Sequence, residues 1–165
     1  MKFRVLFVCL GNICRSSAAE EIFRCEAASR GVAERFEVDS AGTYGGHAGQ
    51  LPDERMRRAG QARGYSFTHR SRPVVRDDFG RFDLILAMDD AVYETLNRLA
   101  PDLEAVDKVE RMADYLPQSF GYDYIPDPYY EGADGFELVL DMLEASCGVL
   151  LTRLSESHHA PDDNL

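Results

Sequence analysis

The segment Phe3–Val8 is apolar at every position except Arg4, and this pattern constrains the fold more than any other feature of the chain. A strand with one face in water alternates apolar and polar side chains, so a strand without that alternation must be covered on both faces. Such strands are typical of parallel sheets that carry helices on both sides. We therefore expect an α/β fold.

The rest of the chain continues this alternation of strand and helix. We expect further strands at residues 36–40, 83–88 and 108–112, and helices at residues 16–30, 52–63, 89–99 and 135–154. A glycine-rich loop spans residues 42–51, short elements fill residues 65–80, and a long loop covers residues 113–134. The pattern predicts one domain over residues 1–155 with a parallel sheet, followed by a polar tail at residues 156–165 that we expect to be disordered.

Composition narrows the classes of partner. A net charge of −11 over 165 residues argues against nucleic acid and anionic membranes as general partners. No apolar run approaches the roughly 20 residues that span a bilayer, and the apolar run near the N-terminus is too short for a signal peptide. Four cysteines in a chain of this size do not form a disulfide framework and fit a reducing compartment. We expect a cytoplasmic protein without membrane association, a monomer or weak dimer.

The loop between the first strand and the first helix has the residues of an anion site. Cys9 ends the strand, and Arg15 lies where the helix begins. Unpaired N–H groups and a partial positive charge at a helix start attract anions, and a guanidinium adds two donors with phosphate geometry. The same field favours the thiolate form of a nearby cysteine. The pattern predicts a nucleophilic thiol beside a bound phosphate.

Two alternatives stay open in this loop. Cys9 could instead be a small buried apolar residue at a strand end. Ser16 could cap the helix, or its hydroxyl could donate a hydrogen bond to the Cys9 sulfur. Gly11 and Asn12 tolerate the left-handed conformation that a loop wrapped around an anion requires.

Three motifs resemble those of the low-molecular-weight protein tyrosine phosphatases. They are Cys9-Leu10-Gly11-Asn12-Ile13-Cys14-Arg15-Ser16, Asp39-Ser40-Ala41-Gly42-Thr43 and Asp127-Pro128-Tyr129-Tyr130. The resemblance runs from about Lys2 to about Ser155, and it departs at Ser17, where the family often has proline. It implies a four-stranded parallel sheet of order 2-1-3-4 in a phosphatase domain. It also implies hydrolysis of phosphotyrosine in proteins through a phosphocysteine, with no cofactor.

The resemblance also implies the role of each site residue. Cys9 would be the nucleophile and Asp127 the general acid. Without the resemblance, the sequence does not show which of its many carboxylates is the acid, and the pair Asp127-Pro128 could equally be an ordinary turn. The phosphate would be held by Leu10, Gly11, Asn12, Ile13, Cys14, Arg15 and Ser16. Leu10, Tyr129 and Tyr130 would wall the substrate pocket, and Tyr44 is the candidate substitute for a tryptophan that many bacterial members place at about Gly46.

A supporting network is implied as well. Ser40 would hold Asn12, while Glu20, Asp39 and His69 would stiffen the site. We expect the two carboxylates to favour the charged form of His69. Cys14 would form a reversible disulfide with Cys9 and so protect the Cys9 sulfur from irreversible oxidation. The alternative is that Cys14 is only a buried cysteine at a helix start.

Other classes of function fit less well. A thiol-linked arsenate reductase has the same fold and loop but relays oxidation through further cysteines, and residues 26–146 contain none. A phosphotyrosine-binding module without turnover would be expected to lose Cys9, Arg15 or the acid. We expect no metal site, because the cysteines lack the spacing of metal ligands and His158-His159 reads as part of a solvated tail.

Overall fold

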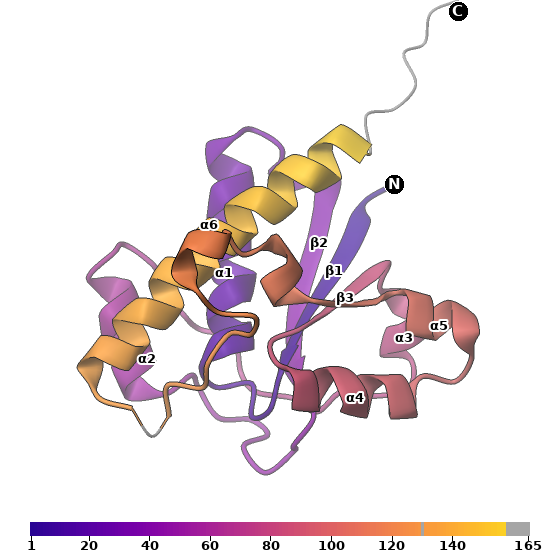
Figure 1. Ribbon diagram of the computed structural model, residues 1–165, viewed down its shortest axis with the longest axis horizontal. Coiled ribbons are helices and arrows are strands. Elements are labelled where there is room, and N and C mark those ends of the chain that lie inside the picture. The colour runs from indigo at the N-terminus through magenta and orange to yellow at the C-terminus, as the bar shows by residue number, and fades with distance from the viewer. Residues whose placement is uncertain (130, 158–165) are drawn as a thin grey trace, which may run out of the picture.

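The computed structural model describes residues 1–129 and 131–157 and contains one parallel sheet of four strands. The strands are β1 (Phe3–Cys9), β2 (Phe36–Gly42), β3 (Leu84–Ala87) and β4 (Val109–Arg111). Their order in the sheet is β2-β1-β3-β4, with every pairing parallel (Figure 1). The predicted fold class and strand order are confirmed.

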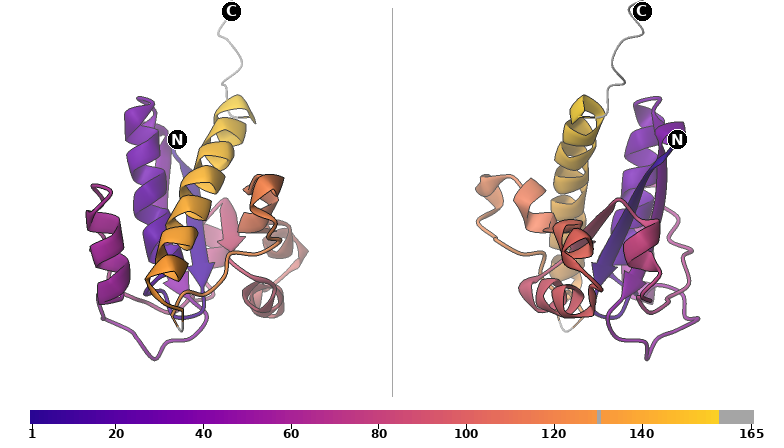
Figure 2. Two further views of the ribbon diagram at one scale, coloured as in Figure 1. Left: turned by 60° about the vertical axis from the view of Figure 1, so that its left-hand side comes forward. Right: turned by 90° about the vertical axis from the view of Figure 1, so that its right-hand side faces the viewer.

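Helices cover both faces of this sheet. The α-helices are α1 (Arg15–Ser29), α2 (Glu54–Gln61), α3 (Asp78–Arg81), α4 (Asp90–Leu99), α5 (Leu103–Asp107) and α6 (Ala133–Ser157). The short 3-10 helices are η1 (Ala33–Arg35), η2 (Met112–Tyr115) and η3 (Gln118–Phe120). Figure 2 shows α1, α2 and α6 on one side of the sheet and α3, α4 and α5 on the other.

The two faces bury separate apolar cores, and β1 contributes to both. Val5 and Phe7 lie in the core shared with α1 and α6, whereas Leu6 and Val8 lie in the core under α3, α4 and α5. All four side chains are fully buried. This two-sided burial is the physical reason why the first strand shows no alternation.

Two local expectations need correction. The last helix continues to Ser157, so residues 155–157 are helical rather than frayed, and residues 158–165, with the histidine pair, lie outside the described residues. Helix α5 was not expected, although Asp102 caps it by accepting the N–H of Ala105. Within the described residues, no helix is both long and apolar enough to cross a bilayer.

The carboxyl ends of the strands gather several loops at one edge of the sheet. The segment after β2 is held against the loop after β1, because the N–H groups of Thr43 and Tyr44 donate to the carbonyls of Cys9 and Leu10 at 3.0 and 2.8 Å. The long loop before α6 reaches the same edge, where the N–H of Ile125 donates to the carbonyl of Met88 at 2.8 Å. The edge lies at the bottom of Figure 1. Ligands bind at this position in open α/β sheets.

Candidate active site

Cys9 ends β1 as a buried thiol with polar partners. Its Sγ accepts the backbone N–H of Asn12 at 3.3 Å and lies 3.0 Å from Oγ of Ser16. An apolar packing residue would have neither partner, so these contacts argue against the alternative that Cys9 is only a buried apolar residue. Ser16 does not cap the helix, because α1 begins at Arg15 and the capping position is Cys14 with no side-chain cap. The Ser16 hydroxyl lies 3.0 Å from the sulfur and 3.3 Å from the carbonyl oxygen of Ala41, which also accepts from it.

Asn12 fixes the shape of the loop around this sulfur. It has φ of 57°, and it is the one residue other than glycine with positive φ in the described part of the chain. Its Nδ2 donates to Oγ of Ser16 at 2.8 Å and to Oγ of Ser40 at 3.0 Å, the latter being the contact expected from the sequence. Its Oδ1 accepts the backbone N–H of Arg72 and lies 3.0 Å from Nε2 of His69.

Arg15 is a buried cation held by three groups from two segments, the start of α4 and the long loop before α6. Its NH1 donates to Oδ2 of Asp89 at 2.7 Å and to the carbonyl of Ile125 at 2.9 Å, and its NH2 lies 3.6 Å from Oδ2 of Asp127. Burial alone would lower the pKa of this guanidinium, but Cys9 and Asp89 raise it. The group therefore stays charged beside the thiol.

Asp89 is a site residue that the sequence reasoning missed. Besides binding Arg15, it caps α4 by accepting the N–H of Val92 at 2.9 Å. The available signal was its position directly after β3, at the sheet edge where the other site residues gather. A carboxylate placed there fixes the guanidinium in one orientation.

Cys9 and Arg15 line one pocket with a volume of about 210 Å³, whereas Asn12, Ser16 and Asp89 are not among its walls. Its walls are Cys9, Leu10, Gly11, Ile13, Cys14, Arg15, Tyr44, His47, Asp127 and Tyr129. Leu10, Tyr44 and Tyr129 are exposed at its mouth. The structure brings together Leu10, Tyr44 and Tyr129, which the sequence analysis expected in the substrate pocket. It adds His47, which was not expected there. The fourth expected residue, Tyr130, lies outside the described residues.

The loop after β2 supplies Tyr44 and His47 to the walls of this pocket. A Cβ placed on Gly46 would come within 2.1 Å of the Tyr44 hydroxyl oxygen, so the Tyr44 ring occupies the space that a side chain at position 46 would take. This places Tyr44 where the substitute for the missing tryptophan was expected. His47 lies with its ring centroid 5.8 Å from that of Tyr44, in an edge-to-face arrangement.

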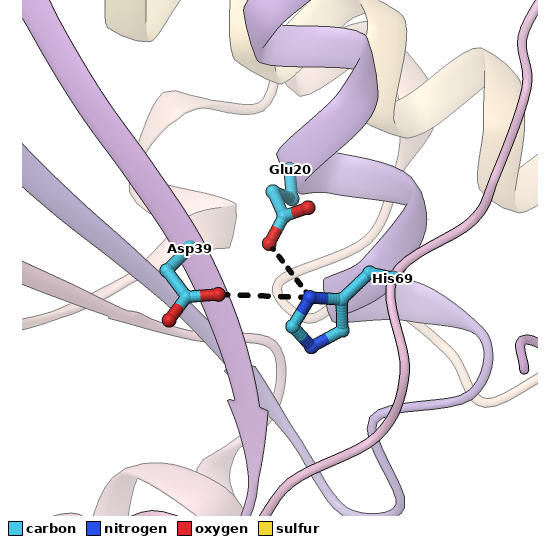
Figure 3. A group of neighbouring side chains, drawn as sticks. All are labelled: Glu20, Asp39 and His69. Carbon is cyan, nitrogen blue, oxygen red and sulfur yellow. Dashed lines mark ion pairs between the residues drawn. The ribbon is translucent and has the colours of Figure 1, made fainter. Parts of the chain in front are cut away.

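Behind the pocket, His69 lies between two carboxylates (Figure 3). Its Nδ1 is 3.3 Å from Oε1 of Glu20 on α1 and 3.6 Å from Oδ1 of Asp39 on β2. Ser40 completes the network by donating its hydroxyl to Oε1 of Glu20 at 3.1 Å. The predicted supporting residues therefore form one connected set that ends on Asn12.

The expectation that His69 is charged is wrong. Burial lowers the pKa of His69, and Arg72 and Arg24 lower it further, against the opposing effect of Asp39. Since Asn12 Oδ1 is an acceptor, Nε2 of the neutral ring carries the hydrogen and donates it. Glu20 is the carboxyl group nearest to Nδ1, and burial raises its pKa to about 7.

Glu20, Asp39 and His69 are also metal-ligand residue types whose donor atoms lie within 4.8 Å of one another. Their remaining atoms are engaged by the protein: Oε2 of Glu20 accepts from Arg24 at 2.8 Å, and Oδ2 of Asp39 accepts from Arg72 at 3.0 Å. These contacts favour a hydrogen-bond network over a cation site.

Cys14 is buried and lines the same pocket as Cys9. Burial, followed by the charges of Asp53 and Cys9, raises the pKa of its thiol. The Cys14 thiol is therefore protonated, unlike the thiolate that a nucleophilic cysteine requires. It lines the same pocket as Cys9.

Comparison with known proteins gives one consistent result. The family model of the low molecular weight phosphotyrosine protein phosphatases matches residues 4–160. A putative low molecular weight protein-tyrosine-phosphatase of Synechocystis is 45% identical over 93% of this chain and 97% of its own length, and a low molecular weight protein-tyrosine-phosphatase of Streptomyces coelicolor is 42% identical over 94% and 96%. A crystal structure of a protein tyrosine phosphatase from Entamoeba histolytica superposes with a TM-score of 0.91 at 42% identity, covering 94% of this chain and 99% of that one. The chain therefore belongs to the low molecular weight phosphotyrosine protein phosphatase family and is an enzyme of that class, a phosphoric monoester hydrolase.

Proposed function

We propose that this enzyme hydrolyses phosphotyrosine and other aryl phosphates through a phosphocysteine formed at Cys9. The observation that supports this most directly is the pocket itself, since Cys9, Arg15 and Asp127 line one cavity with an aromatic mouth. A thiol, a buried cation and a carboxyl group in one small cavity are the three groups that the reaction needs.

In the first half of the reaction, the Cys9 thiolate attacks phosphorus. A sulfur–phosphorus bond forms while the bond from phosphorus to the phenolic oxygen breaks. Arg15 and the N–H groups of the loop after β1 hold the three equatorial oxygens, where charge develops. Protonated Asp127 gives its proton to the departing phenolate oxygen.

In the second half, Asp127 acts in the opposite sense. Its carboxylate accepts a proton from a water molecule, and the water oxygen attacks phosphorus while the sulfur–phosphorus bond breaks. Inorganic phosphate leaves, and the Cys9 thiolate is restored. The Ser16 hydroxyl, 3.0 Å from the sulfur, stabilises that thiolate as a leaving group.

The pocket mouth supports an aromatic substrate. Leu10, Tyr44 and Tyr129 present exposed apolar surface around the opening of the pocket. The floor of the pocket is the loop after β1, residues 9–15, which we call the phosphate loop. A flat phenyl ring buried between such walls gains apolar contact and ring–ring interactions. We propose phosphotyrosine in cytoplasmic proteins as the substrate and a monomer or weak dimer as the acting species.

The test of this function is trapping of the covalent intermediate. Rapid denaturation during turnover of a phosphotyrosine peptide should yield a stoichiometric phosphoenzyme in the wild-type protein and none in Cys9→Ser. Arg15→Lys should lose most of both binding and rate, because an ammonium cannot reproduce the two-point contact. Binding of the peptide without a phosphoenzyme or product would instead identify a binding module, and thioredoxin-coupled arsenate reduction would revive the reductase alternative.

We also propose the redox role of Cys14. Hydrogen peroxide would transfer one oxygen to the Cys9 thiolate, giving a sulfenic acid and hydroxide. The Cys14 thiol would then attack the sulfenic sulfur and form a disulfide with loss of one water. Activity after peroxide should return with dithiothreitol in the wild-type enzyme. In Cys14→Ser it should be lost irreversibly, and equal recovery in both proteins would contradict the proposal.

A further inference from the structure

Arg55, in the first turn of α2, lies outside the reaction described above but contacts the loop that carries its acid. Asp53 holds the guanidinium in place: Nε donates to Oδ1 at 3.1 Å and NH2 donates to Oδ2 at 3.0 Å. Asp53 itself caps α2, and its backbone N–H donates to the carbonyl of Ile13 at 2.7 Å. The guanidinium is therefore anchored to the phosphate loop.

Two aromatic rings from other segments meet this guanidinium. Its Cζ lies 5.3 Å from the ring centroid of Tyr129 and 4.8 Å from that of Phe136 on α6. A guanidinium over an aromatic face is attracted by the ring, and the attraction is retained at partly exposed positions. Arg55 thus joins the start of α2, the loop before α6 and α6 itself.

Tyr129 transmits this contact to the acid. Its backbone N–H donates to Oδ1 of Asp127 at 3.0 Å, so the turn that carries Tyr129 also holds the carboxyl group. The other oxygen, Oδ2, lies 3.6 Å from Arg15. A shift of the Tyr129 ring would therefore move the carboxyl relative to the guanidinium that binds phosphate.

We infer that Arg55 is a positioning residue for the general acid: the clamp formed by Asp53, Arg55, Tyr129 and Phe136 sets where Asp127 lies over the phosphate loop. The inference rests on the proposed role of Asp127. It assigns no contact between Arg55 and the substrate.

The test uses the leaving group of the substrate to distinguish a misplaced acid from a less stable fold. A misplaced acid slows substrates with basic leaving groups most, whereas a less stable fold lowers the rate with all substrates alike. A set of aryl phosphates with leaving groups from p-nitrophenol to phenol is assayed as kcat/KM with Arg55→Gln. A misplaced acid should cost about 10-fold or more with phenyl phosphate and less than about 3-fold with p-nitrophenyl phosphate, because only a basic leaving group needs the proton. Arg58→Gln is the matched control on the same helix, since that side chain is 75% exposed and pairs with Glu54. It should match the wild type on every substrate.

A double mutant gives the decisive comparison. If Arg55 acts through Asp127, Arg55→Gln should add no further loss in an Asp127→Asn background. Additive losses, or an equal loss on all leaving groups by Arg55→Gln alone, would overturn the inference. Should Asp127→Asn itself show no dependence on the leaving group, the proposed role of Asp127 fails instead. Because the Arg55 side chain is 48% exposed, the variant is expected to fold, and a thermal melt checks this.

Discussion

At the scale of single residues, one buried side-chain amide connects the phosphate loop to its support. The side chain of Asn12 makes four hydrogen bonds. One partner is the backbone N–H of Arg72, which can only donate, so the side-chain atom that it contacts is the amide oxygen. Its left-handed backbone adds a second requirement that most residues do not meet. Asparagine is thus selected by conformation and by hydrogen bonding together.

Two substitutions separate these requirements. Asn12→Gly keeps the left-handed backbone but leaves Ser40 and the Arg72 N–H without their partner, so we expect a loss of about 2–4 kcal/mol in the free energy of unfolding. Asn12→Ala should lose roughly 1 kcal/mol more, because alanine resists positive φ. Urea unfolding measures both. A glycine variant as stable as the wild type would show that the hydrogen bonds contribute nothing net.

Asp127 is the second residue whose role can be measured alone. Asp127→Asn keeps the shape of the side chain but cannot donate a proton to the leaving oxygen. We expect kcat/KM to fall by about 10²- to 10³-fold with phenyl phosphate and by less than about 10-fold with p-nitrophenyl phosphate. A uniform loss across leaving groups would argue for a role in binding rather than in proton transfer.

At the scale of elements, the end of β2 supports the loop that follows β1. A Cβ on Gly42 would come within 2.7 Å of the Leu10 carbonyl oxygen and 3.1 Å of the Gly11 carbonyl carbon. Both are backbone atoms of the phosphate loop, so they cannot move aside as a flexible side chain would. The two elements approach closely only because position 42 lacks a side chain.

Gly42→Ala should therefore move the phosphate loop. We expect a loss of about 1–3 kcal/mol in stability from overpacking, together with a fall in kcat/KM of about 10-fold or more from the displaced N–H groups. Gly80→Ala on α3 is the control, since a Cβ there meets nothing within 4 Å. Equal activity of the two variants would contradict the support proposed for β2.

The sequence predicted elements better than it predicted environments. The apolar run of β1 and the alternation of strand and helix were sufficient for a parallel sheet, and the motif at the end of β1 was sufficient for the loop around Cys9. The strand order came only from the resemblance to a known family, because local pattern does not determine which strands become neighbours. Helix α5 escaped because five residues give too little periodicity. His47 and Arg55 reach the pocket or its acid loop only through folding, and no local signal marks them. The charge of His69 was wrong because burial, which sequence spacing does not reveal, outweighs the neighbouring carboxylates.

At the scale of the whole molecule, the network behind the pocket links folding to pH. Glu20 comes from α1, Asp39 from β2 and His69 from the segment before α3, so the network exists only when these parts are assembled (Figure 3). Burial raises the pKa of Glu20 to about 7 from an ordinary value of 4.5. The pKa of Asp39 is lowered: burial opposes the shift, but the N–H of Ser40 and the charge of Arg72 outweigh it. Below its ordinary pKa of 3.8, Asp39 therefore loses the stability it gives the folded state.

The shift at Glu20 predicts a loss of stability as the pH rises. The folded state holds its proton more tightly than the unfolded chain, so the stabilisation is complete below pH 4.5 and disappears as the pH passes about 7. The full effect should amount to at most about 3.5 kcal/mol, since each pKa unit is worth about 1.4 kcal/mol. Urea unfolding between pH 5 and pH 8 measures it. Glu20→Gln should remove this fall and leave the opposite contribution of His69, whose lowered pKa makes stability rise with pH, whereas Glu54→Gln, which changes an exposed carboxylate on α2, should leave the fall in place. If stability still falls with rising pH in Glu20→Gln, a group other than Glu20 takes up the proton, and the assignment of this pH dependence to Glu20 is wrong.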